Sequence, residues 1–357
     1  MIRAVVVDDE APARHRMRYL LQNTDCCVVG EADRGDSAVA QIERLKPDVV
    51  FLDIQMPVFS GLDVASRLSP PRPRIIFCTA FDQFAIKAFE QQAVDYLLKP
   101  VNRDRLARAL DRIRAGIRDQ RAVEEAARTQ AQLMPPAHSF GALECAAVCR
   151  PAEGVGGDYY DILPAGDGRV ALVVADVSGK GIYAGILAAA LQARLQAIAE
   201  RGCADPGAVL TEVNRMTAGS MEAHRFATLF LAVFDPKTSS VRYASAGHPP
   251  ALVISRDGGH RRLEAAGPAI GWGDASFPSE TIAVRPGDLI AIYSDGVTET
   301  LAPDGTDLGV DGLIAAICRH AALTVDDLAR AVLADVDRFS GGAAPGDDRT
   351  LLVARVA

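Results

Sequence analysis

The chain has 357 residues, a formal net charge of −8 and a sequence pI of about 5.3, and this length is comfortable for two domains. The acidic balance argues against a nucleic-acid-binding surface as the main output. Seven cysteines are scattered without a CxxC pair, which predicts neither a zinc site nor a disulfide framework. The chain enters its first strand without a signal peptide and has no apolar run of transmembrane length, so we expect a cytoplasmic protein without membrane contacts.

The first part of the chain alternates apolar strands with amphipathic helices. Strands are predicted over 2–7, 27–32, 49–52, 75–78 and 96–98. Strands separated by helical segments predict an α/β domain with a doubly wound parallel sheet, and such sheets bind ligands at the carboxyl ends of their strands. Several polar residues follow directly after these strands, namely Asp8, Asp9, Asp53, Thr79 and Lys99.

These polar side chains have the chemistry of a phosphorylation site. The carboxylates of Asp8, Asp9 and Asp53 can together hold one divalent cation, because hard oxygen ligands suit Mg²⁺. The hydroxyl of Thr79 and the charge of Lys99 can hold a phosphoryl group formed on Asp53, with the Asp53 carboxylate as the nucleophile. A loop of solvated charges is the alternative, but it does not explain why each residue closes a strand.

Short motifs in this region resemble a known family. Asp53-Ile54-Gln55-Met56-Pro57 with Gly61, and the pair Lys99-Pro100, resemble the phosphorylation loop and the final loop of response-regulator receiver domains, which have a flavodoxin-like fold. The segment Phe81–Phe89 further resembles the LytR/AlgR subgroup of receivers. Members of that subgroup usually carry a DNA-binding domain, which this chain does not show, so we expect the receiver to have another output.

The receiver resemblance implies a role for each polar residue. Asp9 and Asp53 would ligate Mg²⁺ together with the backbone carbonyl of Gln55, and Asp8 would act mostly through water. Asp53 would accept the phosphoryl group from a sensor histidine kinase. The resemblance also implies phosphoryl-binding roles for Thr79 and Lys99, switch roles for Thr79 and the aromatic Tyr96, and a cis peptide bond before Pro100.

A helical linker is predicted over residues 102–136. Its arginines are interleaved with acidic residues, which favours a solvated helical face over a nucleic-acid patch. We expect a signalling helix that forms a homodimer and ends at Leu133–Pro136. The apolar residues that support this prediction have a 4-3-4 spacing, which fits a short coiled coil or a packed amphipathic helix: Leu106, Leu110, Ile113 and Ile117.

Aspartates recur near predicted strands in the second half of the chain. Asp176 ends the apolar run 170–175, Asp295 follows the strand 290–294, and Asp158 follows two glycines. A buried carboxylate is unfavourable unless it is paired or binds a metal, and oxygen ligands without Cys or His suit Mg²⁺ or Mn²⁺ rather than Zn²⁺. Each aspartate alone fits a turn or a helix cap. We predict that each of these aspartates, and the pair Asp347-Asp348, follows a strand. Taken together, they indicate a metal site.

Six motifs in this half occur in the order of a known family. They resemble the metal-dependent serine/threonine phosphatases of the protein phosphatase 2C superfamily, in its bacterial SpoIIE/RsbU branch, over about Ala142 to Val356. The resemblance implies a four-layer α-β-β-α sandwich that hydrolyses phosphoserine or phosphothreonine with water activated by two hard cations. Gly154 departs from the branch, which usually has Glu there, at a position that is not a metal ligand. The motifs are Arg150-Pro151-Ala152-Glu153, Gly156-Gly157-Asp158-Tyr159-Tyr160-Asp161, Asp176-Val177-Ser178-Gly179-Lys180-Gly181, Ala246-Gly247-His248-Pro249-Pro250, Ser294-Asp295-Gly296 and Asp347-Asp348-Arg349-Thr350.

The same resemblance implies the ligands of two Mn²⁺ or Mg²⁺ ions. Asp176 would bridge the two ions, with the backbone carbonyl of Val177 as a further ligand. Asp295 would help to complete one ion, and Asp158 would serve the other directly or through water. The last ligand is Asp347 or its neighbour Asp348, and the alignment of Asp-Asp-Arg-Thr favours Asp347.

Three further residues of this half have alternative interpretations. His248 is either a general acid or a hydrogen-bonded structural residue, and we favour the structural role. Trp272 belongs either to the core or to the rim of the substrate site. Lys180 either guides a phosphate or lies on the surface.

The predicted chain has three parts. A receiver domain covers 1–101, or up to about 120 with its last helix; the helical linker covers 102–136; and the phosphatase domain covers 137–357. We predict a two-component response regulator in which phosphorylation of Asp53 controls the phosphatase. By resemblance, the substrate is a phosphorylated STAS-domain anti-sigma-factor antagonist in a partner-switching pathway. A phospho-gated binding adaptor without turnover and a LytR/AlgR-type transcription factor are the alternatives.

Overall fold

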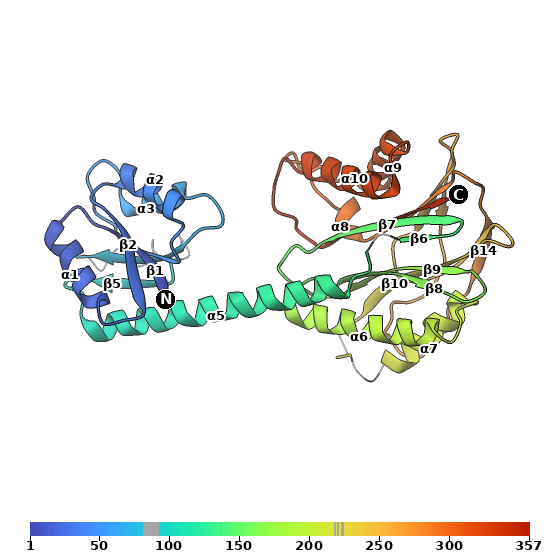
Figure 1. The fold of residues 1–357 in the computed structure, drawn as a ribbon, viewed down its shortest axis with the longest axis horizontal. Coiled ribbons are helices and arrows are strands. Elements are labelled where there is room, and N and C mark those ends of the chain that lie inside the picture. Colours follow the sequence, from blue (N-terminus) through green and yellow to red (C-terminus); the bar gives the residue numbers. More distant parts are fainter. Residues whose placement is uncertain (81–92, 137, 218, 220, 223–224) are drawn as a thin grey trace. The chain divides into compact units, whose positions relative to one another are not determined.

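The computed structural model describes residues 1–80, 93–136, 138–217, 219, 221–222 and 225–357. It divides into two compact units, Met1–Arg121 and Ala122–Ala357, which are described separately (Figure 1). The motif at Phe81–Phe89, on which the LytR/AlgR resemblance depends, lies outside the described residues.

The first unit is a parallel sheet covered by helices on both faces. Its strand order is β2-β1-β3-β4-β5, and every neighbouring pair is parallel. Residues of α1 and α5 share one core cluster with β1 and β3, and residues of α2 and α3 share another on the opposite face. The predicted doubly wound receiver fold is therefore confirmed. The elements are β1 (Ile2–Val7), α1 (Ala11–Leu21), β2 (Cys26–Ala32), α2 (Gly35–Leu45), β3 (Val49–Asp53), α3 (Gly61–Arg67), β4 (Arg74–Thr79), β5 (Asp95–Leu98) and α5 (Arg103–Leu133).

The apolar stripe of α5 packs within the receiver core. Leu106, Leu110 and Ile113 are buried beside β1 and β3, and Ile117 packs against the same cluster. Of the two predicted alternatives, the packed amphipathic helix is right for this stretch and the coiled-coil seam is wrong. A 4-3-4 spacing specifies one apolar stripe on a helix, and here the sheet covers that stripe. A homodimer through this helix stays a prediction.

The second unit contains two antiparallel sheets. The first has the strand order β14-β11-β10-β9-β8, and the second has the order β13-β12-β15-β16-β7-β6. The first sheet is built from β8 (Asp158–Pro164), β9 (Val170–Val177), β10 (Ala227–Asp235), β11 (Ser240–Ala246) and β14 (Glu280–Ala283). The second is built from β6 (His138–Phe140), β7 (Leu143–Arg150), β12 (Ala251–Ile254), β13 (His260–Leu263), β15 (Leu289–Tyr293) and β16 (Arg349–Val356).

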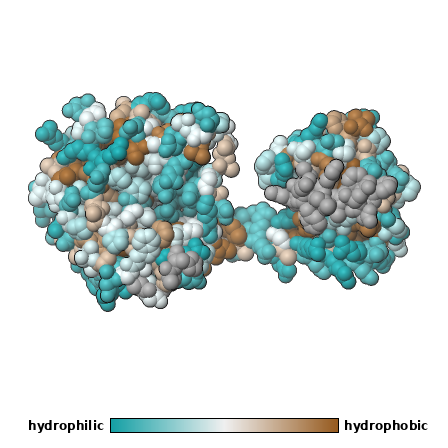
Figure 2. Space-filling model, turned by 180° about the vertical axis from the view of Figure 1, so that it is seen from behind, coloured by the Kyte–Doolittle hydropathy of each residue, from teal (hydrophilic) through white to brown (hydrophobic). Residues whose placement is uncertain are grey.

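Helices cover the outer face of each sheet, which completes four layers (Figure 1). One core cluster joins α6 and α7 to the first sheet, a second fills the space between the sheets, and a third joins α9 and α10 to the second sheet. The predicted α-β-β-α sandwich is confirmed. On the face seen in Figure 2, hydrophilic and hydrophobic side chains are interspersed over the surface of this unit. The helices are α6 (Gly181–Ala199), α7 (Pro206–Thr217), α8 (Asp295–Thr298), α9 (Gly309–His320) and α10 (Val325–Phe339).

Helix α6 is long and apolar enough to cross a membrane, and it is the one helix among the described residues with these properties. Half of this segment is buried inside the unit, where it packs against β8 and β9. The core helix of a globular domain has the same length and composition, so α6 is weak evidence for a membrane span.

Candidate active site

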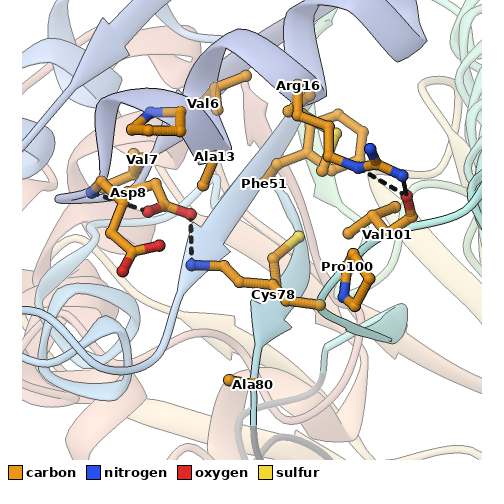
Figure 3. Close-up of a pocket in the computed structure, with 14 residues that line it drawn as sticks. Val6, Val7, Asp8, Ala13, Arg16, Phe51, Cys78, Ala80, Pro100 and Val101 are labelled. Carbon is orange, nitrogen blue, oxygen red and sulfur yellow. Dashed lines mark hydrogen bonds and ion pairs between the residues drawn. The ribbon is translucent and has the colours of Figure 1, made fainter.

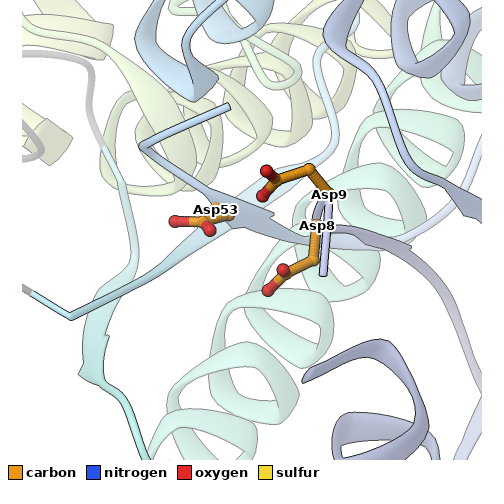
Figure 4. Close-up of side chains that lie close together, drawn as sticks. All are labelled: Asp8, Asp9 and Asp53. Carbon is orange, nitrogen blue, oxygen red and sulfur yellow. The ribbon is translucent and has the colours of Figure 1, made fainter. Parts of the chain in front are cut away.

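Three carboxylates of the receiver unit meet at the carboxyl ends of β1 and β3. One oxygen from each of Asp8, Asp9 and Asp53 lies within 4.8 Å of the others (Figure 4). Lys99, which follows β5, places its Nζ 2.7 Å from Asp8 Oδ2 and 2.6 Å from Asp53 Oδ2. Parallel strands bring these side chains together because their carboxyl ends meet at one edge of the sheet.

Burial and ion pairing shift the pKa of the Asp53 carboxylate in opposite directions. Burial raises the pKa of Asp53, and the hydrogen bond from Lys99 only partly offsets this effect. Burial alone would lower the pKa of Lys99, but its bonds to Asp53 and Asp8 raise it overall. The backbone N–H of Gln55 donates to Asp53 Oδ1 at 3.2 Å. A Cβ at Gly61 would lie 2.1 Å from the carbonyl oxygen of Asp53, so the first residue of α3 must be glycine for this approach.

The remaining predicted receiver residues surround this cluster. Thr79 ends β4 fully buried, and its carbonyl accepts a hydrogen bond from the backbone N–H of Lys99 at 2.8 Å. Tyr96 is half-buried on β5. The Lys99–Pro100 peptide bond is cis, as predicted.

A pocket of about 370 Å³ adjoins the cluster (Figure 3). Asp8 and Lys99 line it together with mostly apolar residues such as Phe51 and Cys78. The guanidinium of Arg16 donates to the carbonyl oxygen of Val101 at 3.0 and 3.2 Å on another side of this pocket. We assign no function to it.

Strand alternation aims the polar residues of the second unit into the space between its sheets. Tyr160, Leu172 and Phe230 fill that space, so Asp158 and Asp176, which have the same parity on β8 and β9, face it as well. By the same argument, Thr350 on β16 shares the face of Leu352. The aspartates therefore meet where the layer between the sheets ends.

The prediction that each aspartate follows a strand is wrong for two positions. Asp158 is the first residue of β8, where it pairs directly with Asp176 near the end of β9, and Asp347 precedes β16. The strands are antiparallel, so the beginning of one strand lies beside the end of its neighbour. Residues that begin one strand and residues that end its neighbour therefore lie at the same edge of the sheet.

Asp158 is held by two hydroxyl groups that the sequence did not point to. The hydroxyls of Ser294 and Thr350 donate to its Oδ2 at 2.7 and 2.6 Å. Its Oδ1 is buried without a hydrogen-bond partner among the described residues. Burial, and then the charge of Asp176, hold the pKa of Asp158 well above its usual range. A buried carboxylate oxygen without a partner is a position where a cation or its water would be stabilising.

Negative charge is concentrated around Asp176. Burial, followed by the charges of Asp295, Asp347 and Asp348, raises the pKa of Asp176 to about 7. Burial and Asp347 also raise the pKa of Asp295. All these donors are oxygens, which suit Mg²⁺ or Mn²⁺, and a bound cation would relieve their repulsion.

The neighbours Asp347 and Asp348 have different contacts. Asp348 is buried and accepts backbone N–H groups from Ala152 through Oδ1 and from Gly157 through Oδ2, both at 2.7 Å. Asp347 is more exposed, and its Oδ1 lies 3.6 Å from Nζ of Lys180. These contacts favour Asp347 as the outward-facing ligand and give Asp348 the task of holding the loop before Asp158.

Glycines allow that loop to approach the Asp348 carboxylate and the Val177 carbonyl. A Cβ at Gly156 would lie 2.5 Å from Asp348 Oδ2, and one at Gly157 would lie 2.5 Å from the carbonyl oxygen of Val177. The Val177 carbonyl is the predicted backbone ligand. Any larger residue at these two positions would displace the loop or the group that it approaches.

The three residues with alternative interpretations, His248, Trp272 and Lys180, differ in their burial. His248 is buried, its Nδ1 shares a 2.7 Å hydrogen bond with Thr228 Oγ1, and burial lowers its pKa to about 3. A neutral imidazole of this kind supports the structural role. Trp272 is 56% exposed, so it is not a core residue. Lys180 donates to the carbonyl oxygen of Gly346, next to Asp347.

The last part of α5, which belongs to this unit, contacts the same loop. Gln130 on α5 donates through Nε2 to the carbonyl oxygen of Gly156 at 2.7 Å, and its Oε1 accepts the Gly156 N–H at 3.1 Å. Sequence reasoning missed Gln130 because a single glutamine in a charged helix carries no signal of its own. Ser294 and Thr350 belong to the same sequence motifs as predicted metal ligands. Their place in these motifs was the available signal that they contribute to the site.

Comparisons with known proteins agree with both units. The family model for stage II sporulation protein E (SpoIIE) matches residues 166–357, and the model for the response regulator receiver domain matches residues 4–111. The transcriptional regulatory protein BtsR of Salmonella typhi is 51% identical over 116 residues, which are 32% of this chain and 48% of that protein. The chain thus spans about half the length of the curated relatives it matches.

Solved structures resemble the second unit. The SiaA-PP2C domain of Pseudomonas aeruginosa matches with a TM-score of 0.62 at 22% identity, over 68% of this chain and 99% of that domain, which shows the fold. The RsbU and RsbW domains of Rv1364c from Mycobacterium tuberculosis match with a TM-score of 0.52 at 27% identity, over 60% and 59% of the two chains. The predicted resemblances to receivers and to PP2C-type phosphatases are confirmed. The chain belongs to the SpoIIE family and carries a response-regulator receiver domain at its N-terminal end.

Proposed function

We propose that this chain is a response regulator whose phosphorylation at Asp53 controls a Mg²⁺- or Mn²⁺-dependent phosphoserine/phosphothreonine phosphatase. The observation that carries the proposal is the group of partly buried carboxylates in the second unit, where burial and then the neighbouring acidic charges raise the pKa of Asp176 to about 7. Such crowding is unfavourable in the absence of cations and is found where ions bind. A phospho-gated adaptor without turnover has no need of it.

The acidic residues around Asp176 would supply the oxygen ligands for a pair of divalent cations. One cation would be held by oxygen atoms of Asp176, the Val177 carbonyl, Asp295 and Asp347. Asp158 would serve the other cation directly or through water. When bound, the cations supply a more acidic water and offset the charge of the phosphoryl oxygens.

The chain's own residues keep that ligand set in place. Ser294 and Thr350 orient Asp158 through its Oδ2 and leave its Oδ1 facing the site. Asp348 fixes the loop that leads to Asp158 through the N–H groups of Ala152 and Gly157.

The receiver site would work with a Mg²⁺ ion held by Asp8, Asp9, Asp53 and the Gln55 carbonyl. Lys99 already contacts Asp53 at 2.6 Å and would pair with a phosphoryl oxygen after phosphorylation by a sensor histidine kinase. Thr79 would bind another phosphoryl oxygen, and Thr79 and Tyr96 would act as the switch residues.

Helix α5 supports a route between the two sites. Its first half is part of the receiver core through Leu106, Leu110 and Ile113. Its later residue Gln130 holds the loop at Gly156 by two hydrogen bonds. We propose that phosphorylation changes the position of this helix and so changes how the loop presents Asp158. A homodimer through α5 belongs to the same proposal.

The substrate that we propose is a phosphorylated STAS-domain anti-sigma-factor antagonist in a partner-switching pathway in the cytoplasm. Its support is the resemblance of the second unit to the RsbU and RsbW domains of Rv1364c. Neither nucleic acid nor a membrane is a partner in this scheme.

The test is hydrolysis by the full-length protein of a phosphorylated STAS-domain protein and of an aryl phosphate, with Mn²⁺ or with chelator. Beryllofluoride, which mimics phospho-Asp53, is added to the wild type and to Asp53→Ala. We expect Mn²⁺-dependent turnover whose rate changes with beryllofluoride only in the wild type. Binding of the phosphoprotein without any turnover would support the adaptor, and a beryllofluoride response in Asp53→Ala would refute control through Asp53.

A further inference from the structure

Arg225 lies beside the turn that follows Asp176. The Nη1 of Arg225 donates to the carbonyl oxygen of Ser178 at 3.1 Å, and its Nε is buried without a hydrogen-bond partner among the described residues. In the same described part of the chain, no ion pair joins Arg225 to an acidic side chain. A guanidinium has five N–H donors, so most of those on Arg225 have no hydrogen-bond acceptor among the described residues.

The backbone fixes Arg225 to this turn. The N–H of Ser178 donates to the carbonyl oxygen of Phe226 at 2.9 Å, and the N–H of Phe226 donates to the Ser178 hydroxyl at 3.0 Å. A Cβ at Gly179 would lie 2.2 Å from Arg225 Nη1, and Gly179 has a φ of 100°. Glycine at this position therefore lets the guanidinium approach the turn.

An aromatic ring lies against the guanidinium, and an aromatic pair lies at the next residue of the chain. Its Cζ lies 4.8 Å from the ring centroid of Tyr183, a distance at which a cation and an aromatic face attract each other. Phe226 packs against Trp272 with a centroid distance of 5.0 Å, and Trp272 is 56% exposed. A phosphoprotein segment that reaches the turn would meet both a fixed positive charge and apolar surface.

We propose that Arg225 is a substrate-binding residue that donates hydrogen bonds to oxygens of the phosphoryl group. This inference rests on the proposed phosphatase function and adds a substrate contact to it. The planar guanidinium pairs well with phosphate oxygens, and its charge offsets the repulsion between a phosphate dianion and the aspartates around Asp176. Tyr183 and Ser178 hold the guanidinium in place, so less side-chain freedom is lost when the substrate binds.

The test uses inorganic phosphate as the probe. Trp272 is the single tryptophan of the chain and contacts the residue after Arg225, so its fluorescence reports binding at this place without turnover. The full-length protein with Mn²⁺ is titrated with phosphate as the wild type, Arg225→Ala, Arg225→Lys and the control Arg201→Ala. Arg201 pairs with Glu212 on the surface and is not part of the site. Inhibition of aryl phosphate hydrolysis by phosphate is measured in parallel.

We expect Arg225→Ala to weaken phosphate binding about ten-fold or more, because a hydrogen bond between charged groups is lost. Arg225→Lys should keep part of the affinity, and Arg201→Ala should bind phosphate like the wild type. The Mn²⁺ concentration for half-maximal activity should not change in Arg225→Ala. Unchanged phosphate affinity in Arg225→Ala would overturn the proposal. A parallel loss of Mn²⁺ affinity would also overturn it, because Arg225 would then only hold the turn. A wild type that binds phosphate through Arg225 but hydrolyses nothing would refute the phosphatase function instead.

Discussion

The two acidic sites of this chain differ in how their negative charge is balanced. In the receiver, Lys99 lies within 2.7 Å of both Asp8 and Asp53. In the phosphatase unit, the ion pair described at the aspartates joins Lys180 to Asp347 at 3.6 Å, and both side chains are substantially exposed. Exposed pairs of this kind contribute little, and Asp176 remains surrounded by acidic neighbours.

The difference shows what each site needs in order to work. A carboxylate paired with a partly buried lysine can stay charged between two states of a switch. A group of aspartates without such a lysine depends on cations for both its charge and its geometry. Cations and substitutions of carboxylates should therefore affect the second unit more strongly than the first.

The largest effect should come from removing the central carboxylate of the second site. Asp176→Asn should lower aryl phosphate hydrolysis by about a thousand-fold or more, since an amide cannot replace a shared carboxylate ligand. Circular dichroism should show an unchanged fold. The matched control is Asp311→Asn, because the Asp311 side chain is 91% exposed and pairs with Arg262. Residual activity within ten-fold of the wild type would contradict the ligand role of Asp176.

Cation binding should separate the stabilities of the two units. At about 100 times its dissociation constant, Mn²⁺ should stabilise the phosphatase unit by about 2.7 kcal/mol, which corresponds to about 5–10 °C for a unit of this size. Scanning calorimetry of the full-length wild type and Asp176→Asn would measure this shift. The shift should be absent in Asp176→Asn. An equal shift in both proteins would show that the stabilising ion lies elsewhere.

The hydroxyls that hold Asp158 should have an intermediate effect. Ser294→Ala and Thr350→Val each remove one donor to Asp158 Oδ2, and we expect each to lower Mn²⁺ affinity or activity by about 10- to 100-fold. Thr211→Val on α7 is the control, because the Thr211 hydroxyl donates to the Gly207 carbonyl and accepts the Phe277 N–H, and neither group belongs to the aspartate site. Full activity of the double variant Ser294→Ala with Thr350→Val, at the Mn²⁺ concentrations that the wild type needs, would exclude a role of these hydroxyls in positioning Asp158.

The sequence indicated the strands and most acidic positions because apolar runs stop at Asp53, Asp176 and Asp295. It did not reveal that Asp158 begins a strand, since Gly-Gly-Asp has the composition of a turn. The hydroxyl donors escaped prediction for a different reason. Ser294 and Thr350 are 136 and 192 residues away from Asp158 along the chain, and only the register of the strands brings them together.

The helix α5 shows a second limit of sequence reasoning. The spacing of Leu106, Leu110 and Ile113 specifies an apolar stripe but not the surface that covers it. A second helix and the receiver sheet satisfy the same pattern, and the structure uses the sheet. The polar contact of Gln130 with Gly156 is set by the length and direction of the helix, which no local pattern reports.

The smallest expected effect concerns this contact, and it tests whether the two sites communicate through α5. Gln130→Ala removes both hydrogen bonds to Gly156, so the loop before Asp158 loses one of its attachments while Asp348 and Val177 still hold Gly157. We expect basal phosphatase activity to change about two- to ten-fold, because hydrogen bonds of this kind contribute about 0.5–1.5 kcal/mol each.

The more informative readout of Gln130→Ala is its response to beryllofluoride. If the helix carries the signal to the loop, the change in rate caused by beryllofluoride should shrink toward none, although Asp53 and its cluster are intact. Gln132→Ala is the matched control, because Gln132 is an exposed glutamine on the same helix. A beryllofluoride response as large in Gln130→Ala as in Gln132→Ala would show that the receiver reaches the phosphatase by a route other than Gly156, even if both sites work as proposed.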